Sequence, residues 1–203
     1  MTPSRMAVTT PCFTPGTLVA TARGPAPVET LRPGDRVVTR DDGLCEVLWI
    51  GRRTVTFAEL GRSEEFRPVL IAEGALGNGG PRQNMFVSPR HRFLMMRGGE
   101  EVLTPAHRLV DGRGVRPVAV LGVSYLHLLF ARHQVILADG VWTESFRPGA
   151  AVWAGLGNSQ RIEIETLFPE IRTGALYRLS RPARALDDMP LWRQRMEVRP
   201  ERR

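Results

Sequence analysis

Glycine and proline occur along the whole chain and limit the length of any regular element within it. The sequence has 203 residues, of which 20 are Gly and 16 are Pro. Both residue types interrupt helices and strands and concentrate in turns. This composition predicts an all-β architecture of many short strands joined by turns. With 42% apolar residues, the chain can bury a core, and its length suits one domain plus an extension.

Short apolar and β-branched stretches between the turns mark the expected strands. The segment 45–55 alternates apolar and polar side chains, as a half-buried strand does. Segments 125–130 and 135–138 flank residues 131–132 and indicate a hairpin that closes near the Asp-Gly turn at 139–140. The remaining expected strands are 17–21, 37–39, 67–71 and 92–96, and a Gly/Asn-rich loop is expected over 74–82.

The charge pattern and the metal-binding residue types argue against several functions. The formal net charge is +7 and comes from Arg, which can attract nucleic acid. The Arg residues are nevertheless spread along the chain and are not interleaved with aromatic residues as in a stacking platform. Two Cys and four scattered His lack the paired spacing of a structural zinc site or a disulfide framework. We therefore expect no metal or other cofactor, and we do not expect nucleic acid as the main partner.

The N-terminal residues and the hydropathy of the chain bear on its location. The stretch MTPSRMAVTTP lacks the apolar run of a signal peptide, and no segment approaches membrane-spanning length. We therefore expect a soluble, cytoplasmic chain without a membrane partner.

Cys12 is the first residue whose position suggests chemistry. It follows Pro11 and a polar leader, and it precedes a Thr-Pro-Gly-Thr stretch at 14–17 that is typical of a turn. A thiol with only a packing role would be expected inside a strand, as is Cys45. Cys12 is therefore a candidate nucleophile, and the alternative is an inert buried thiol.

The block at 86–94 reads Phe-Val-Ser-Pro-Arg-His-Arg-Phe-Leu and places Ser88 three residues before His91. Imidazole has a free pKa near ~6.5, so it exchanges protons at neutral pH. A nearby hydroxyl can orient that ring or donate to a carbonyl group. Thiol, hydroxyl and imidazole are together the groups needed to break a peptide bond from within the chain. The alternative for His91 is a solvent-facing turn histidine beside Pro89.

These stretches resemble the Hedgehog/intein (Hint) superfamily over roughly residues 12–149. The matching features are the N-terminal Cys followed by a Thr-x-Val strand, the segment VETLRPGDRVV, and a Ser-x-x-His motif where the family usually has Thr-x-x-His. The resemblance implies a Hint-type disc of short strands with two pseudo-twofold β-subdomains. In agreement with this, segment 106–115 echoes segment 28–37 through matched Leu, Gly and Val residues.

The resemblance also implies an autocatalytic reaction at the bond before Cys12. The thiol would attack the carbonyl carbon of Pro11 through a five-membered ring and move the acyl group from nitrogen to sulfur. His91 would protonate the departing nitrogen, Ser88 would help to activate the carbonyl group, and Thr17 would support the turn. The product of this N–S acyl shift is a thioester.

The segment 125–140 resembles the late Hint block, in which a Tyr-rich strand leads to a His and then to an Ala-Asn-Gly-like turn. His133 would then be a second acid or base, the alternative being a hairpin-edge histidine. His127 could share the site, but a two-residue turn would put it and His133 on opposite faces of the sheet. We expect His107 at the surface.

The family pattern fails at the residues that protein splicing requires. Splicing needs a C-terminal His-Asn pair, because the Asn cyclises and releases the downstream chain. Aligning the Ala-Asp-Gly turn at 138–140 puts Glu144 and Ser145 at those positions, and Phe146 then offers no nucleophile. We therefore expect cleavage of the Pro11–Cys12 bond without full splicing. The substrate would be the chain's own N-terminal segment, and water, a thiol or an amine would resolve the thioester.

Three other functions remain open on the sequence alone. The chain could be a catalytically silent Hint scaffold whose C-terminal tail binds a partner. It could also be a basic nucleic-acid-binding module, or a cysteine hydrolase that acts on a separate substrate.

The expected organisation has three parts: a flexible leader over 1–11, a Hint domain over 12–149, and a C-terminal extension over 150–203 with one or two helices. In the extension, Ser159 is expected to cap a helix over 159–167, with Ile162, Ile164 and Leu167 on its apolar side. A second helix is expected over 182–196.

Overall fold

The computed structural model describes residues 11–149, 152–153, 156–169 and 182–186, and nearly all of its regular structure is β-strand. The strands are β1 (Leu18–Thr21), β2 (Gly24–Pro27), β3 (Arg36–Thr39), β4 (Gly43–Glu46), β5 (Trp49–Val55), β6 (Val69–Ile71), β7 (Met85–Val87), β8 (Arg92–Arg97), β9 (Glu100–Pro105), β10 (Val115–Pro117), β11 (Val123–Leu129), β12 (Val135–Ala138), β13 (Val141–Glu144) and β14 (Ala185–Leu186). Two α-helices, α1 (Phe57–Arg62) and α3 (Asn158–Leu167), and three 3-10 turns, η1 (Val28–Thr30), η2 (Glu64–Phe66) and η3 (Ala106–Arg108), complete the described elements. The expected all-β class with a small helical addition is confirmed.

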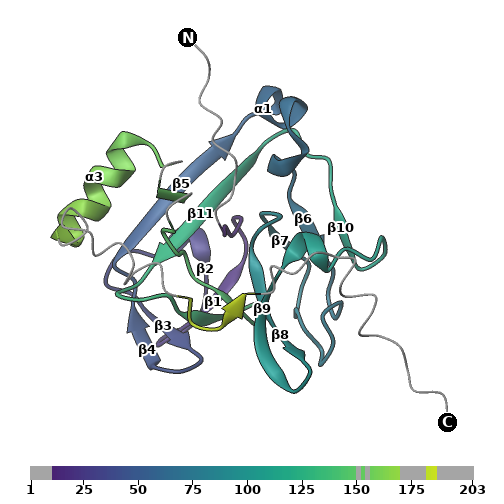
Figure 1. The fold of residues 1–203 in the computed structure, drawn as a ribbon, viewed down its shortest axis with the longest axis horizontal. Helices are drawn as coiled ribbons and strands as arrows, with labels where there is room; N and C mark the ends of the chain where they lie inside the picture. Colours follow the sequence, from purple (N-terminus) through teal and green to yellow (C-terminus); the bar gives the residue numbers. More distant parts are fainter. Residues whose placement is uncertain (1–10, 150–151, 154–155, 170–181, 187–203) are drawn as a thin grey trace.

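The strands form three sheets that wrap around a shared interior (Figure 1). The largest has the order β14-β9-β8-β13-β12-β1-β3-β4, with β2 paired to β1. A three-stranded sheet has the order β10-β6-β7, and β5 and β11 form a long antiparallel ribbon. This ribbon crosses the molecule diagonally in Figure 1 and carries part of the candidate site.

Two halves of the chain repeat the same path. The hairpin β1–β2 leads through η1 to β3, and the hairpin β8–β9 leads through η3 to β10. At the start of each 3-10 turn a backbone amide donates to the residue before the hairpin, Val28 to Thr17 O and Ala106 to His91 O, both at 2.8 Å. Thr17 and His91 therefore hold equivalent places, and the two 3-10 turns begin at the matched positions 28 and 106 of the predicted echo.

The two glycines matched in that echo have the same backbone role. Gly34 has φ +97° and Gly112 has φ +75°, which are values that side chains with a Cβ atom rarely adopt. Each glycine lets the chain leave its 3-10 turn and enter the following strand.

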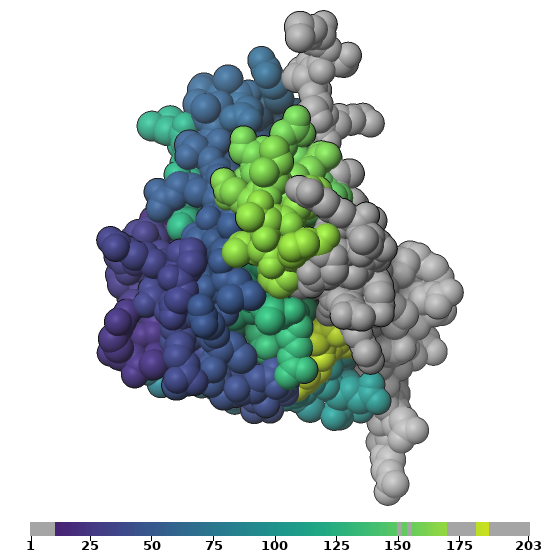
Figure 2. Space-filling model, turned by 90° about the vertical axis from the view of Figure 1, so that its left-hand side faces the viewer, coloured from purple at the N-terminus to yellow at the C-terminus, as the bar shows by residue number. Residues whose placement is uncertain are grey.

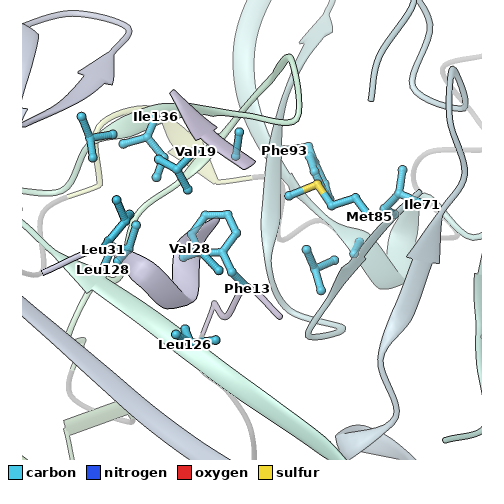
Figure 3. Close-up of a cluster of buried hydrophobic side chains, with 14 of the residues drawn as sticks. Phe13, Val19, Val28, Leu31, Ile71, Met85, Phe93, Leu126, Leu128 and Ile136 are labelled. Carbon is cyan, nitrogen blue, oxygen red and sulfur yellow. The ribbon is translucent and has the colours of Figure 1, made fainter. Parts of the chain in front are cut away.

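Phe13 lies at the centre of the main apolar core, among side chains from several strands (Figure 3). Its backbone pairs with Leu126 of β11, with N–O distances of 3.0 and 2.9 Å, and it also bridges to Val87 of β7. Burial of an aromatic side chain of this kind stabilises a fold by roughly 1.5–3 kcal/mol relative to its exposure. The chain segment next to Cys12 is therefore fixed by both packing and hydrogen bonds.

Two strand predictions are wrong in detail. The segment 45–55 is divided between β4 and β5, because the amide of Val47 donates to Asp35 O and that of Leu48 donates to Leu129 O. The chain thus changes from one sheet to the other at this point.

The predicted hairpin between segments 125–130 and 135–138 is also absent, since β11 pairs with β5, and β12 pairs with β13. The two-residue turn at 139–140 instead joins β12 to β13. Asp139 and Gly140 have φ values of +47° and +79°, as tight hairpin turns with left-handed central residues require.

In the extension, α3 begins at Asn158, and its N-cap residue is Gly157 rather than Ser159. Only Ile164 of the expected apolar side is buried, whereas Ile162 and Leu167 are 59% and 47% exposed. Residues two apart on a helix do not share a face, which explains the exposure of Ile162. The helix lies against the β5 region of the body (Figure 2), where the Trp49 indole donates to Glu163 at 2.6 Å.

The second predicted helix, over 182–196, is replaced in its described part by strand β14, which pairs in parallel with β9. Residues 187–196 of this prediction, and the leader up to residue 10, lie outside the described residues. In the described part of the chain, no helix combines the length and apolar character needed to cross a membrane.

Candidate active site

Cys12 lies in the interior, with only 1% of its surface exposed. Its amide donates to Ser88 Oγ at 3.0 Å, and its carbonyl oxygen accepts from the Ser88 amide at 3.1 Å. These bonds lock the segment around the Pro11–Cys12 peptide bond against the turn that follows β7. The structure therefore brings the predicted nucleophile and the predicted Ser88 together across 76 positions of sequence.

The thiol of Cys12 is protonated in this environment. Burial raises the pKa of the Cys12 thiol far above its usual value, and a hydrogen bond with Ser88 and the charge of Arg53 oppose this only in part. A neutral thiol is a weak nucleophile. Any attack by Cys12 therefore needs a base within the site that removes the proton as the sulfur reacts.

His127, in the middle of β11, contacts both the thiol and the adjacent peptide bond. Its Nδ1 lies 3.1 Å from the carbonyl oxygen of Pro11, and its Nε2 lies 3.8 Å from the Sγ atom of Cys12. Because a carbonyl oxygen only accepts hydrogen bonds, Nδ1 must carry the proton. In the neutral ring, Nε2 then presents its lone pair to the thiol.

The charge state of His127 agrees with this assignment. Burial lowers the pKa of His127 to about 4, and the hydrogen bond to the Pro11 carbonyl group opposes the shift without cancelling it. The imidazole is therefore neutral at physiological pH. A neutral imidazole beside a neutral thiol is the arrangement in which proton transfer can generate the nucleophile.

His91 is fully buried, and its ring packs edge-on against Phe13 with 4.5 Å between ring centroids. Its Nε2 has a short contact with the hydroxyl of Thr143, which itself donates to Arg92 O at 2.8 Å. The hydroxyl proton is thus committed to Arg92 O, so His91 Nε2 is the donor and Nδ1 is unprotonated. Among the described residues, Nδ1 has no hydrogen-bond partner.

Burial also lowers the pKa of His91 to about 4, with the charge of Glu144 acting in the opposite direction. The backbone amide of His91 donates to Ser88 O at 3.0 Å, which closes the Ser-Pro-Arg-His turn. The structure therefore places His91 in the same turn as Ser88 and within the packing around Phe13. In this protonation state, His91 is an acceptor at Nδ1 rather than an acid.

His133 lies beyond the end of β11 and has different partners. Its Nδ1 accepts from the amide of Ala183 at 2.9 Å, and its Nε2 lies 3.5 Å from Glu144 Oε2. It is His127, not His133, that the structure brings to the Cys12 thiol. The argument against His127 assumed a tight hairpin between the two histidines, and the chain instead passes from one sheet to another there.

The remaining residues singled out in the sequence have simpler positions. Thr17 is buried and closes the turn after Cys12, since its amide donates to Thr14 O at 3.3 Å. His107 is exposed and contacts Pro89 O through Nδ1. Cys45 is half-buried against the main core, with its Sγ atom 3.7 Å from Thr39 Oγ1. No group of three potential metal ligands is gathered among the described residues.

The family model described as the Hint domain matches residues 11–150. The chain belongs to the Hint domain family. No curated protein matches the sequence.

Among solved structures, a bacterial intein-like domain from Clostridium thermocellum is 17% identical, with a TM-score of 0.48, and the match covers 66% of this chain and 97% of that domain. A DnaB intein from Synechocystis sp. PCC 6803 is 9% identical, with a TM-score of 0.45, and the match covers 66% of this chain and 98% of the intein.

Proposed function

We propose that this Hint domain cleaves its own Pro11–Cys12 bond by an N–S acyl shift. The observation that carries the proposal is the double contact of His127, to the thiol through Nε2 and to the Pro11 carbonyl oxygen through Nδ1. One neutral ring is thereby positioned both to take the thiol proton and to stabilise negative charge on the oxygen under attack. Each of these two effects is worth roughly a hundredfold or more in rate.

In the first step, the Sγ atom of Cys12 attacks the carbonyl carbon of Pro11 while its proton passes to His127 Nε2. A new C–S bond forms, and the carbonyl oxygen takes up negative charge opposite the Nδ1–H donor of His127. The C–N bond then breaks as the protonated His127 ring returns that proton to the Cys12 nitrogen, so the imidazole is neutral again at the end of the step. The product is a thioester between Pro11 and the Cys12 side chain.

Ser88 supports this step because its Oγ lies 3.0 Å from the nitrogen that must leave. That oxygen accepts the N–H of Cys12, so it fixes the orientation of the scissile peptide bond relative to the thiol. We propose that His91 acts mainly through position, because its amide closes the turn that holds Ser88 and its Nδ1 carries no proton in the resting state.

The thioester must be resolved by an outside nucleophile. In hydrolysis, water adds its oxygen to the Pro11 carbonyl carbon and returns a proton to the Cys12 sulfur. A thiol or an amine would take the acyl group in the same way. We do not propose splicing, because Glu144 and Ser145 stand where the aligned family pattern has its His-Asn pair, and neither can cyclise to a succinimide.

Intact-mass measurement of the full chain during incubation with a small thiol tests the proposal. We expect a product that begins at Cys12, no such product from the variant Cys12→Ala, and unchanged cleavage in Cys45→Ser. A full-length mass that persists in the unmodified chain, or cleavage that survives Cys12→Ala, would overturn it.

A further inference from the structure

The C-terminal segment 182–186 docks on the edge of the main sheet. Its strand β14 pairs in parallel with β9, and the two lie side by side in Figure 1. In Figure 2 this segment, in yellow, lies at the surface beside the teal strands of the β8–β9 hairpin. It forms the edge strand of the largest sheet, although about eighty residues separate it from β9 along the chain.

Arg184 fastens this segment to the body through two carboxylates. Its guanidinium donates to both oxygens of Asp41, at 3.0 and 2.5 Å, and to Glu101 at 2.8 Å. Paired contacts of this kind fix the position of a guanidinium group more firmly than a single charge contact does. Glu101 is itself held by Arg40 at 2.6 Å, so the docking site is charged and complementary.

The docked segment also determines which nitrogen of His133 carries a proton. The Ala183 amide donates to Nδ1 of the buried ring, so Nδ1 must be unprotonated and Nε2 must hold the hydrogen. Nε2 lies 3.5 Å from Glu144 Oε2, close enough for the carboxylate charge to act on the ring but without a hydrogen bond between the two atoms. Among the described residues, the Ala183 amide is therefore the hydrogen-bond partner that fixes the tautomer of His133.

Glu144 connects this histidine to the candidate active site. Its other oxygen accepts from the Arg92 amide at 3.0 Å, and the preceding residue, Thr143, holds the His91 ring. The hydroxyl of Thr143 donates in turn to Arg92 O. The backbone amide and the carbonyl group of Arg92 thus both bond to the end of β13, and Arg92 directly follows His91.

We infer that the docked segment Pro182–Leu186 is a positioning element for the active site, which acts on His91 through Ala183, His133 and Glu144. This inference rests on the proposed function for its effect on rate. Its structural part is that a distant strand controls the His133 and His91 rings, and this part can be tested without cleavage. His133 is then a positioning residue rather than an acid or base at the thiol.

The test compares the full chain with two variants that disturb the docking in different ways. Arg184→Ala removes the guanidinium contacts with Asp41 and Glu101. Ala183→Pro removes the amide that donates to His133, while Arg184 remains. Arg23→Ala is the matched control, because it deletes an Arg from a surface pair with Asp35, away from β9 and His133. Nitrogen-15 NMR of the imidazole rings reports the tautomers of His133 and His91, and intact mass reports the cleavage rate.

We expect the unmodified chain and Arg23→Ala to show His133 with its proton on Nε2. Both docking variants are expected to lose that single tautomer, to shift the His91 ring signals, and to cleave at least several-fold more slowly. Unchanged ring signals in Arg184→Ala and Ala183→Pro would overturn the inference, as would altered signals with an unaltered rate. If the unmodified chain does not cleave at all, the proposed function fails, whereas the ring signals still decide whether the segment controls His91.

Discussion

The Nε2 atom of His127 lies 3.8 Å from the Sγ atom of Cys12, although 115 positions separate the two residues in the sequence. The antiparallel pairing of Phe13 with Leu126 produces this proximity, because it places the residue before Phe13 beside the residue after Leu126. A thiol held in its neutral form by burial thus has a neutral imidazole as its neighbour. The predictions below follow from this pair and its surroundings.

Replacing the base should slow cleavage without removing the nucleophile. In His127→Gln, the amide group can still donate to the Pro11 carbonyl oxygen but cannot take a proton from the thiol. We expect the cleavage rate to fall roughly a hundredfold or more, as loss of general-base catalysis does. Time courses of intact mass measure this rate.

The surface residue His107 provides the matched control for that change. His107→Gln replaces an exposed histidine whose contact with Pro89 O a glutamine amide can also make. It should therefore cleave at the rate of the unmodified chain. Equal rates in all three proteins would remove His127 from the mechanism.

The dependence of the rate on pH distinguishes proton transfer within the site from attack by free thiolate. Burial lowers the pKa of His127 to about 4, so its Nε2 lone pair is available well above that pH. We expect a nearly level rate between about pH 6 and 8, and a decline as the pH approaches 4 and the ring becomes protonated. A rate that rises about tenfold with each pH unit across that range would show that hydroxide in solution, not His127, generates the thiolate.

Stability should also fall in mild acid, because two histidines are buried in their neutral form. The pKa of both His91 and His127 is lowered to about 4 from 6.5. Between those values the unfolded chain binds more protons than the folded chain, so the free energy of unfolding decreases as the pH falls. Each ring contributes up to about 1.4 kcal/mol per pH unit.

Urea denaturation at about pH 6.5 and pH 5 measures that decrease. The variant His127→Gln should lose roughly half of it, since one of the two titrating rings is gone. The same decrease in both proteins would mean that His127 is not held neutral in the folded chain. Both comparisons use Cys12→Ala as the background, so that cleavage does not interfere.

The helix α3 offers a matched pair of substitutions on opposite sides. Ile164 is fully buried in a cluster with Trp49 and Phe146, whereas Ile162 is 59% exposed. Ile164→Ala should lower the free energy of unfolding by about 2–5 kcal/mol, and Ile162→Ala should change it by less than about 0.5 kcal/mol. Similar effects of both substitutions on urea denaturation would mean that α3 does not pack on the body in this orientation.

The sequence contained enough information for the fold class and for half of the site. Gly and Pro spacing predicted short strands, and the Ser-x-x-His turn predicted a hydroxyl and an imidazole in one place. Because Ser88 and His91 belong to one turn, a local pattern was sufficient to group them. The family resemblance predicted that both would meet Cys12. In the structure Ser88 makes that contact through the backbone of Cys12, whereas the His91 ring packs against Phe13.

The contact between His127 and Cys12 could not be read from local patterns. Strand β11 is buried from Tyr125 to Leu129, so its residues lack the alternation that would have shown which side chains face the site. The strand's partner was also misjudged, because β5 pairs with it rather than the segment that follows it. Which residues lie opposite each other in a sheet is fixed by the pairing register, and this depends on the whole fold.

Trapping of the thioester tests the central claim most directly. The full chain is incubated with hydroxylamine, and the released N-terminal segment is identified by mass spectrometry. The account predicts a segment that ends at Pro11 as a hydroxamate, formed in Cys45→Ser but not in Cys12→Ala. Release of that segment only as a free acid at a rate that hydroxylamine does not change, or no release at all, would contradict an acyl group carried by the Cys12 sulfur.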